Sequence, residues 1–236
     1  MNIEVLADAG AVAARGAAFI AEDARRAAAA RGRCLIALSG GRTPWAMLRL
    51  LAVEDVPWEK EHLFQADERV APAADADRNL GHLRASLLDR IPLPADQMHA
   101  MPVESPDLVA AAARYAHDLK AAAGVPPVLD LVHLGLGADG HTASLVPGDP
   151  VLEVTNEDVA LTRAYLGRVR MTVTYRVLAR ARRILWVVSG AEKAPMLARL
   201  LAGDRSIPAG RVRADDALIL ADEAAAAGRE GSVQHP

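Results

Sequence analysis

Short apolar runs alternate with longer mixed segments along most of this chain. The first clear case is the run Cys34 to Leu38, which contains only apolar residues and is followed by the mixed segment Trp45 to Ala52. Apolar runs of about four to eight residues are typical of strands buried on both faces, and longer segments of helical period are typical of the helices that cover them. We therefore expect repeated βαβ units. The predicted strands are 34–38, 62–66, 98–101, 129–134, 159–162, 169–174, 184–188 and 218–220, and the predicted helices are 9–30, 45–52, 80–88, 108–122 and 191–201.

This alternation predicts an α/β fold with a doubly wound, mostly parallel open sheet of Rossmann-like type, flanked by helices on both faces. Prolines such as Pro92 and Pro126 separate elements without a long polar linker, so one domain over 1–236 is expected. The segment 223–236 runs from alanines into Gly-Arg-Glu-Gly-Ser and is expected to be a frayed tail. Sheets of this kind bind ligands outside the carboxyl ends of their strands, so the loops that follow strands are the places to search for chemistry.

Composition narrows the classes of partner. The 236 residues carry a formal charge of −3, which does not provide the positive field of a nucleic-acid-binding protein. The single cysteine, Cys34, cannot form an internal disulfide, and Met1 to Gly10 lack the features of a secretion signal. No apolar run approaches the roughly 20 residues that span a bilayer. We expect a cytoplasmic protein with no membrane or nucleic-acid partner, a monomer or small homo-oligomer that acts on a small molecule.

The loop after the strand 34–38 has the composition of an anion site. Its two glycines allow a sharp turn, Thr43 suits a helix N-cap, and Pro44 suits the first helical turn. Free N–H groups at a helix start favour phosphate, although an ordinary capped turn would show the same residues. The candidate phosphate-binding residues here are Ser39, Gly40, Gly41, Arg42 and Thr43.

Charged residues are concentrated after the second strand, in Asp67-Glu68-Arg69 and again near Arg78 and Asn79. A carboxylate at this position can orient a sugar hydroxyl or a water molecule, and an arginine can hold a phosphate in fork geometry. Asp67 and Arg69 are the candidates. The alternative is that these charges coat a surface loop.

The loop Gly135 to Ser144 contains a GxGxxG pattern and His141. A dinucleotide-binding loop should lead into a long helix, but Pro147 and Gly148 interrupt the chain too early. A histidine on a glycine-rich turn after a buried strand suits general-base catalysis near neutral pH. A metal site formed by His141 with Asp139 or Asp67 is possible in principle, but no paired histidines at helical spacing support it, so neither a metal nor another cofactor is expected. A covalent serine mechanism is not favoured, because Ser144 lacks the GxSxG elbow.

Two cations complete the candidate set. Arg170 begins an alternating strand, where it could contact a ligand or pair with a carboxylate at the sheet edge. Lys193 follows the strand 184–188 and is one of only three lysines among 27 cationic residues. A lysine in the first turn of a helix opposes the helix dipole, which a neighbouring phosphate would explain, although a surface lysine would also fit.

Taken in order, these motifs resemble the glucosamine-6-phosphate isomerase/6-phosphogluconolactonase superfamily, and its lactonase branch in particular. The deaminase branch typically continues the glycine-histidine block with Ile-Ala-Phe-Asn-Glu-Pro, where this chain has Thr-Ala-Ser-Leu-Val-Pro at 142–147. The chain departs from the lactonases at Arg78, where serine is usual, and near Ala179, where an asparagine is common. The motifs that carry the resemblance are SGGRTP at 39–44, DERV at 67–70, GLGADGHTASLVPG at 135–148, RMTVT at 170–174, SGAEK at 189–193 and IPAGRV at 207–212.

The resemblance implies hydrolysis of the sugar-phosphate lactone 6-phospho-D-glucono-1,5-lactone to 6-phosphogluconate, a step of the pentose phosphate pathway. His141 is then expected to activate water, with Asp139 orienting the histidine and Asp67 orienting water or a hydroxyl. Arg69 and Lys193 would meet the phosphate or developing charge, together with the backbone at 40–43. Three alternatives remain, namely a glucosamine-6-phosphate deaminase, a nicotinamide-dependent dehydrogenase and a non-catalytic sugar-phosphate sensor.

Overall fold

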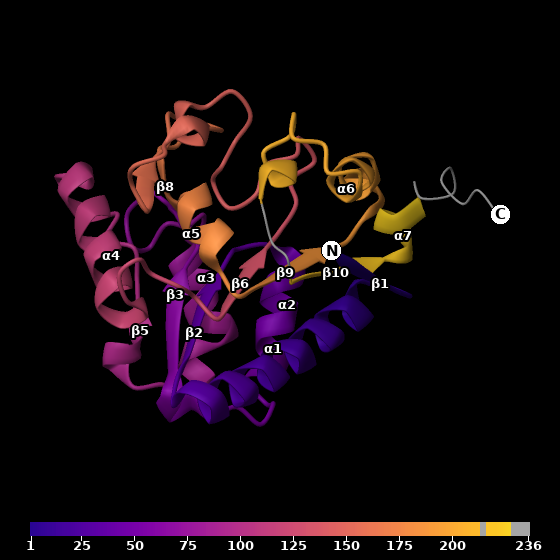
Figure 1. Cartoon of the computed structure of the whole chain (residues 1–236), viewed down its shortest axis with the longest axis horizontal. Helices are drawn as coiled ribbons and strands as arrows, with labels where there is room; N and C mark the ends of the chain where they lie inside the picture. The colour runs from indigo at the N-terminus through magenta and orange to yellow at the C-terminus, as the bar shows by residue number, and fades with distance from the viewer. Residues whose placement is uncertain (213–215, 228–236) are drawn as a thin grey trace.

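The computed structural model describes residues 1–212 and 216–227. Its main layer is a seven-stranded sheet in which every strand pair is parallel, in the order β1-β10-β9-β6-β2-β3-β5 (Figure 1). The prediction of an α/β fold with a doubly wound parallel sheet is therefore confirmed. The strands are β1 (Asn2–Leu6), β2 (Cys34–Leu38), β3 (Glu61–Gln65), β5 (Met98–His99), β6 (Leu131–Leu134), β9 (Arg183–Val188) and β10 (Ala217–Asp222).

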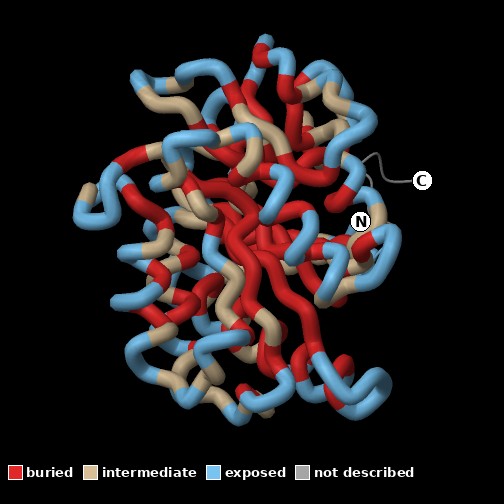
Figure 2. The backbone as a smooth tube through the Cα atoms, turned by 90° about the vertical axis from the view of Figure 1, so that its left-hand side faces the viewer, coloured by how far each residue is buried: buried red, intermediate tan, exposed pale blue. Residues whose placement is uncertain are grey.

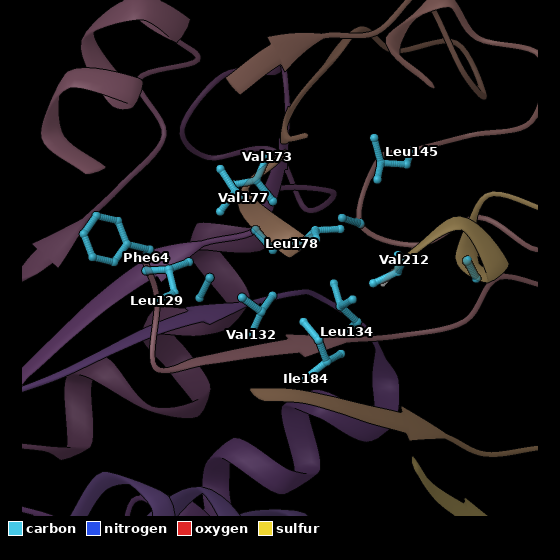
Figure 3. Close-up of a cluster of buried hydrophobic side chains, with 14 of the residues drawn as sticks. Phe64, Leu129, Val132, Leu134, Leu145, Val173, Val177, Leu178, Ile184 and Val212 are labelled. Carbon is cyan, nitrogen blue, oxygen red and sulfur yellow. The ribbon is translucent and has the colours of Figure 1, made fainter. Parts of the chain in front are cut away.

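Helices cover both faces of the main sheet. One apolar cluster joins α1, α2 and α3 to one face, and a second joins α4 to α7 to the other face. Figure 2 shows the buried strands running through the middle of the molecule, and Figure 3 shows part of the second cluster, where Val132 and Leu134 of β6 meet Leu178 of α5. The helices are α1 (Ala9–Arg31), α2 (Arg42–Leu51), α3 (Asn79–Ser86), α4 (Leu108–Ala123), α5 (Tyr175–Arg180), α6 (Ala194–Leu201) and α7 (Glu223–Ala226).

The direction of winding reverses between β2 and β6. From β2 the chain adds β3 and β5 on one side, and from β6 it adds β9 and β10 on the other. The loops that leave the carboxyl ends of β2 and β6 therefore diverge to opposite sides of the sheet and leave a crevice between them. Ser39 follows β2 and Gly135 follows β6, so both glycine-rich loops begin at this crevice.

A second sheet differs from the sequence-based expectation. It has three antiparallel strands in the order β4-β8-β7, with bounds Asp67–Arg69, Arg170–Val173 and Val159–Leu161. The prediction that Asp67 to Arg69 form a loop was wrong, as was the implied place of Arg170 to Val173 in the main sheet. The strand β4 was not predicted because its residues are charged, and charged residues are rarely buried. Glu68 is nevertheless fully buried, paired with Arg78, whose Nε lies 3.2 Å from Glu68 Oε2. The edge strand β1 was also missed.

The segment 223–236, predicted to be a frayed tail, is described by the structure as far as residue 227. Glu223 to Ala226 form α7, whose start is capped by the Asp222 side chain accepting from the N–H of Ala225. The rest of that prediction, 228–236, lies outside the described residues. Among the helices of 1–212 and 216–227, none is long and apolar enough to cross a membrane.

A buried carboxyl group at the amino end of the main sheet gives a stability prediction. Glu61 at the start of β3 is fully buried, and within the described chain neither of its carboxyl oxygens has a hydrogen-bond partner among N and O groups. Burial raises the pKa of Glu61 to about 8, only partly offset by a hydrogen bond with the thiol of Cys34. The folded protein therefore keeps a proton that an unfolded chain, with a Glu pKa of about 4.3, releases.

The free energy of unfolding should fall as the pH rises from about 5 to 8, with a slope of at most about 1.4 kcal/mol per pH unit from this group. Glu61→Gln should flatten that slope, whereas Glu59→Gln, at an exposed neighbouring position, should not. Urea denaturation at a series of pH values measures both. An unchanged slope in Glu61→Gln would show that Glu61 does not hold the proton.

Candidate active site

A cavity of about 560 Å³ opens at the carboxyl ends of β2, β6 and β9, at the reversal point of the main sheet. The small sheet forms its other wall through residues of β4 and β8. We call it the switch-point cavity. Asp139, one of the eleven predicted site residues, does not line it but lies behind His141. The other ten line the cavity and are Ser39, Gly40, Gly41, Arg42, Thr43, Asp67, Arg69, His141, Arg170 and Lys193.

The loop 39–44 differs in detail from the prediction. The helix α2 begins at Arg42 and its N-cap is Gly41, at φ 143°, so the prediction that Thr43 caps the helix was wrong. No side chain accepts a hydrogen bond from the first N–H groups of α2, and the Thr43 hydroxyl instead lies 2.7 Å from the hydroxyl of Ser189. Uncapped N–H groups at a helix start are free to receive an anion. A side chain at Gly40 would collide with the amide of Asn79, which explains glycine there.

Beneath this loop, the backbone N–H of Ser39 donates to Nδ1 of His133 on β6 at 3.4 Å. His133 is fully buried, and burial lowers its pKa to about 4. It is therefore neutral near pH 7, as the acceptor role at Nδ1 requires. His133 supports the floor of the cavity and does not line it.

His141 and Asp139 form a hydrogen-bonded pair. Their Nδ1 and Oδ1 atoms are 2.6 Å apart, and the backbone N–H of His141 donates to the same oxygen at 3.2 Å. Partial burial alone would raise the pKa of Asp139, but hydrogen bonds from His141 and Tyr165 outweigh it and hold that pKa below its usual range. The carboxylate is therefore ionised, and because Nδ1 faces it, Nε2 is the nitrogen left for a ligand.

The turn that carries this pair is closed by backbone hydrogen bonds. The N–H of Gly137 donates to the carbonyl of His141 at 2.8 Å, and the N–H of Gly140 donates to the carbonyl of Gly137 at 3.0 Å. A Cβ on Gly137 would fall on the His141 ring and 2.5 Å from Asp139 Oδ1. Glycine at 137 therefore allows the imidazole and carboxylate to lie over the backbone.

Sequence reasoning missed Tyr165, in the connection between β7 and β8. Its hydroxyl donates to Asp139 Oδ2 at 2.7 Å, and its ring contacts the His141 ring edge to face, with centroids 5.6 Å apart. The guanidinium of Arg170 lies 4.9 Å from the centre of the same ring. No motif pointed to Tyr165, because the contact joins residues 26 positions apart through two different sheets.

Asp67 is a nearly buried carboxylate of the cavity lining. It is 4% exposed and accepts hydrogen bonds from the Ser144 hydroxyl at 2.6 Å and from Asn79 Nδ2 at 3.3 Å. These bonds fix its orientation, and they give Ser144 a structural partner away from His141. Within 1–212 and 216–227, no three His, Cys, Asp or Glu side chains are grouped as a metal site would need.

The cavity lining contains four cations and three carboxylates, Asp67, Glu192 and Asp222. None of its four cations forms a salt bridge with another described residue, whereas most other arginines in the same ranges do. Arg69 donates to the carbonyl of Asp77 and to Asn79 Oδ1, both at 2.7 Å. The pKa of Arg170 is lowered mainly by burial and, to a smaller extent, by the positive charge of Arg69. A dianion such as phosphate would relieve this repulsion. The four cations are Arg42, Arg69, Arg170 and Lys193.

Other charged residues of 67–79 do not reach the cavity. Arg78 is 2% exposed and bridges Glu68 and Glu104. Asp75 and Asp77 accept from Arg168 on the outside of the small sheet. Arg78, which departs from the lactonase pattern, is therefore part of a buried ion-pair network beside the cavity.

The fold and this cavity define an α/β protein built to act on a small phosphorylated molecule. The family model of glucosamine-6-phosphate isomerases/6-phosphogluconolactonase matches residues 7–220, and the chain belongs to this family. It is 37% identical to a 6-phosphogluconolactonase of Nostoc sp. over 98% of this chain and 99% of that protein. It is also 37% identical to a 6-phosphogluconolactonase of Mycobacterium tuberculosis, over 96% of this chain and 97% of that one.

Solved structures agree on the fold. The 6-phosphogluconolactonase of Thermotoga maritima superposes with a TM-score of 0.84 at 26% identity, covering 94% of this chain and 98% of that chain. A monomeric glucosamine-6-phosphate deaminase superposes with a TM-score of 0.85 at 18% identity, covering 97% of this chain and 100% of that one. The second likeness shows the shared fold alone, so the two branches must be told apart by residues and not by backbone shape.

Proposed function

We propose that this chain is an enzyme that hydrolyses 6-phospho-D-glucono-1,5-lactone to 6-phosphogluconate, in the pentose phosphate pathway. One observation carries the proposal: His141, which is hydrogen-bonded to Asp139, lines the same cavity as four cations without salt bridges, and the volume of this cavity lies in the range that encloses small ligands. Relatives that match nearly the whole chain carry the name of this activity.

The pair His141–Asp139 supplies the base. A lactone is a cyclic ester, so its hydrolysis needs an activated water molecule and a proton for the departing ring oxygen. His141 Nε2 takes a proton from water as it attacks the carbonyl carbon, and Asp139 stabilises the resulting imidazolium through Nδ1–H. When the tetrahedral intermediate collapses, the C–O ring bond breaks and the imidazolium returns the proton to the ring oxygen.

The cations hold the phosphate end of the substrate. Arg69, Arg170 and Lys193, with Arg42 and the free N–H groups at the start of α2, offer more donors than one phosphate needs. Fixing the phosphate converts the attack into a positioned reaction of bound groups. Asp67, held by Ser144 and Asn79, is the carboxylate available to orient a sugar hydroxyl or the water.

We propose further that the enzyme works in the cytoplasm as one domain, as a monomer or small homo-oligomer, with neither a nucleic-acid partner nor a cofactor. The formal charge of −3 and the single, buried cysteine support this.

The activity is tested by generating the lactone in situ and following acid release, with the spontaneous rate subtracted. The purified chain should accelerate acid release and should release no ammonia from glucosamine 6-phosphate. Ammonia release without lactone hydrolysis would place the chain with the deaminases. Binding without turnover of either compound would make it a sensor.

Lys193→Ala should raise the KM for the lactone about tenfold, because one charge-assisted contact to phosphate is worth about 1.5 kcal/mol, and should leave kcat nearly unchanged. Lys60→Ala is the matched control, since Lys60 is an exposed lysine outside the cavity. Initial-rate kinetics on the three proteins give both constants. A wild-type KM in Lys193→Ala would remove Lys193 from the phosphate site.

A further inference from the structure

Tyr165 stands at the tip of a tight hairpin between β7 and β8. The backbone groups of Tyr165 and Arg168 donate to each other's carbonyls at 2.9 and 3.2 Å. The turn between them uses positive φ angles at Leu166 (51°) and Gly167 (79°). The small sheet therefore holds the phenol firmly against the loop that carries His141.

This one side chain contacts three groups of the proposed site. Its hydroxyl donates to Oδ2 of Asp139, while Oδ1 of the same carboxylate accepts from the ring and the backbone of His141. Its ring also contacts the His141 ring edge to face and lies under the guanidinium of Arg170. Tyr165 thus connects the base to one of the proposed phosphate-binding cations.

We propose that Tyr165 is a positioning residue that fixes Asp139 against His141, limits how strongly the carboxylate polarises the imidazole, and supports Arg170 with its ring. This inference rests on the proposed function for its kinetic consequences, but the contact itself is open to a test that needs no substrate.

The hydroxyl acts on orientation and on charge. A carboxylate bonded through one oxygen can turn about its Cβ–Cγ bond, whereas bonds to both oxygens fix its plane. The phenol also withdraws negative charge from the carboxylate, so less remains to favour a protonated His141. The pKa of Tyr165 is raised mainly by burial and, next, by its hydrogen bond to Asp139, so the phenol stays protonated and remains a donor.

The ring acts on the phosphate end. The Nε of Arg170 is buried and without a hydrogen-bond partner in the part of the chain that the structure describes. Its planar group is therefore held by stacking on Tyr165, an arrangement that stabilises an arginine without neutralising it. Besides Tyr165, the charged groups that act on Arg170 are Arg69, Asp67 and Asp77, and Tyr165→Phe leaves all three in place.

Three variants separate these effects. Tyr165→Phe removes the hydroxyl and keeps the ring, and Tyr165→Leu removes both. Tyr175→Phe is a closely matched control: the Tyr175 hydroxyl donates to the carbonyl of Pro208 at 2.8 Å, Arg211 lies 4.9 Å above its ring, and it does not line the switch-point cavity. Steady-state kinetics over a pH series and an NMR titration of His141 in the free protein are the two readouts.

In Tyr165→Phe, kcat should fall roughly tenfold with KM unchanged, because the base is less well aligned. The acid limb of kcat/KM and the NMR titration of His141 should both move to higher pH, because Asp139 becomes a stronger acceptor from the imidazolium. Tyr165→Leu should show both effects and also a KM raised severalfold. Tyr175→Phe should match wild type in every constant.

Wild-type kcat and an unmoved acid limb in Tyr165→Phe would overturn the inference, as would a lower kcat with no shift in either titration, which would mark a merely structural role. If wild-type protein does not hydrolyse the lactone, the proposed function fails. The NMR titration of His141 then still decides on the contact, since an unmoved midpoint in Tyr165→Phe would refute it.

Discussion

His141→Ala should lower kcat for lactone hydrolysis by about 10²–10⁴-fold, the usual contribution of a positioned acid–base group. The loss should be large because one imidazole acts in both steps, first as the base toward water and then as the acid toward the ring oxygen. His141 is half-exposed on a loop and takes no part in either apolar cluster, so the variant should fold normally. Acid release measured above the spontaneous rate gives the comparison.

The matched control is His117→Ala, which removes an exposed histidine of α4 that does not line the cavity. It should keep wild-type kinetics. If His141→Ala retains wild-type kcat while its thermal unfolding is also unchanged, the general-base mechanism is wrong, even though membership of the family would stand.

The second large effect is expected from a single methyl group. Gly137→Ala should lower kcat by about 10²-fold, because its Cβ must displace both His141 and Asp139 from their present positions. Kinetics together with the free energy of unfolding will separate displacement of the pair from loss of the fold. Gly81→Ala is the control: nothing lies within 4 Å of a Cβ at this exposed helical position, so it should keep kcat and gain about 0.5–1 kcal/mol of stability.

The double variant Gly137→Ala/His141→Ala sharpens this prediction. If Gly137 acts only by leaving room for His141 and its partner, the double variant should be no slower than His141→Ala alone. Multiplying losses would show that the glycine serves some other part of the reaction, and the steric explanation would then be wrong.

The main sheet could be predicted because its signal is local. The runs 34–38 and 184–188 are apolar at nearly every position, as strands buried on both faces must be, and they became β2 and β9. The position of the glycine-rich loops follows from the same pattern, because loops at the carboxyl ends of neighbouring parallel strands begin at the same edge of the sheet. This is why the candidate residues 39–43, after β2, and His141, after β6, line one cavity.

The features that escaped prediction depend on partners distant in the sequence. The strand β4 is made of charged residues, and the burial of its Glu68 depends on the ion pair with Arg78 and on backbone N–H groups of residues such as Asn79 and Leu80. The edge strand β1 gains its place by pairing with β10, more than 200 positions later. Tyr165 meets Asp139 only once the small sheet has formed. The helix start at Gly41 depends on a backbone angle open mainly to glycine, which made the cap at Thr43 unnecessary.

The proposed mechanism requires that the base and the phosphate-binding cations act on one molecule in one cavity. A crystal structure of the chain with bound 6-phosphogluconate tests it most directly. We expect the phosphate among Arg69, Arg170 and Lys193, and the carboxylate carbon, which was the lactone carbonyl, within reach of a water held by His141 Nε2. A phosphate bound elsewhere, or a carboxylate turned away from His141, would contradict the account.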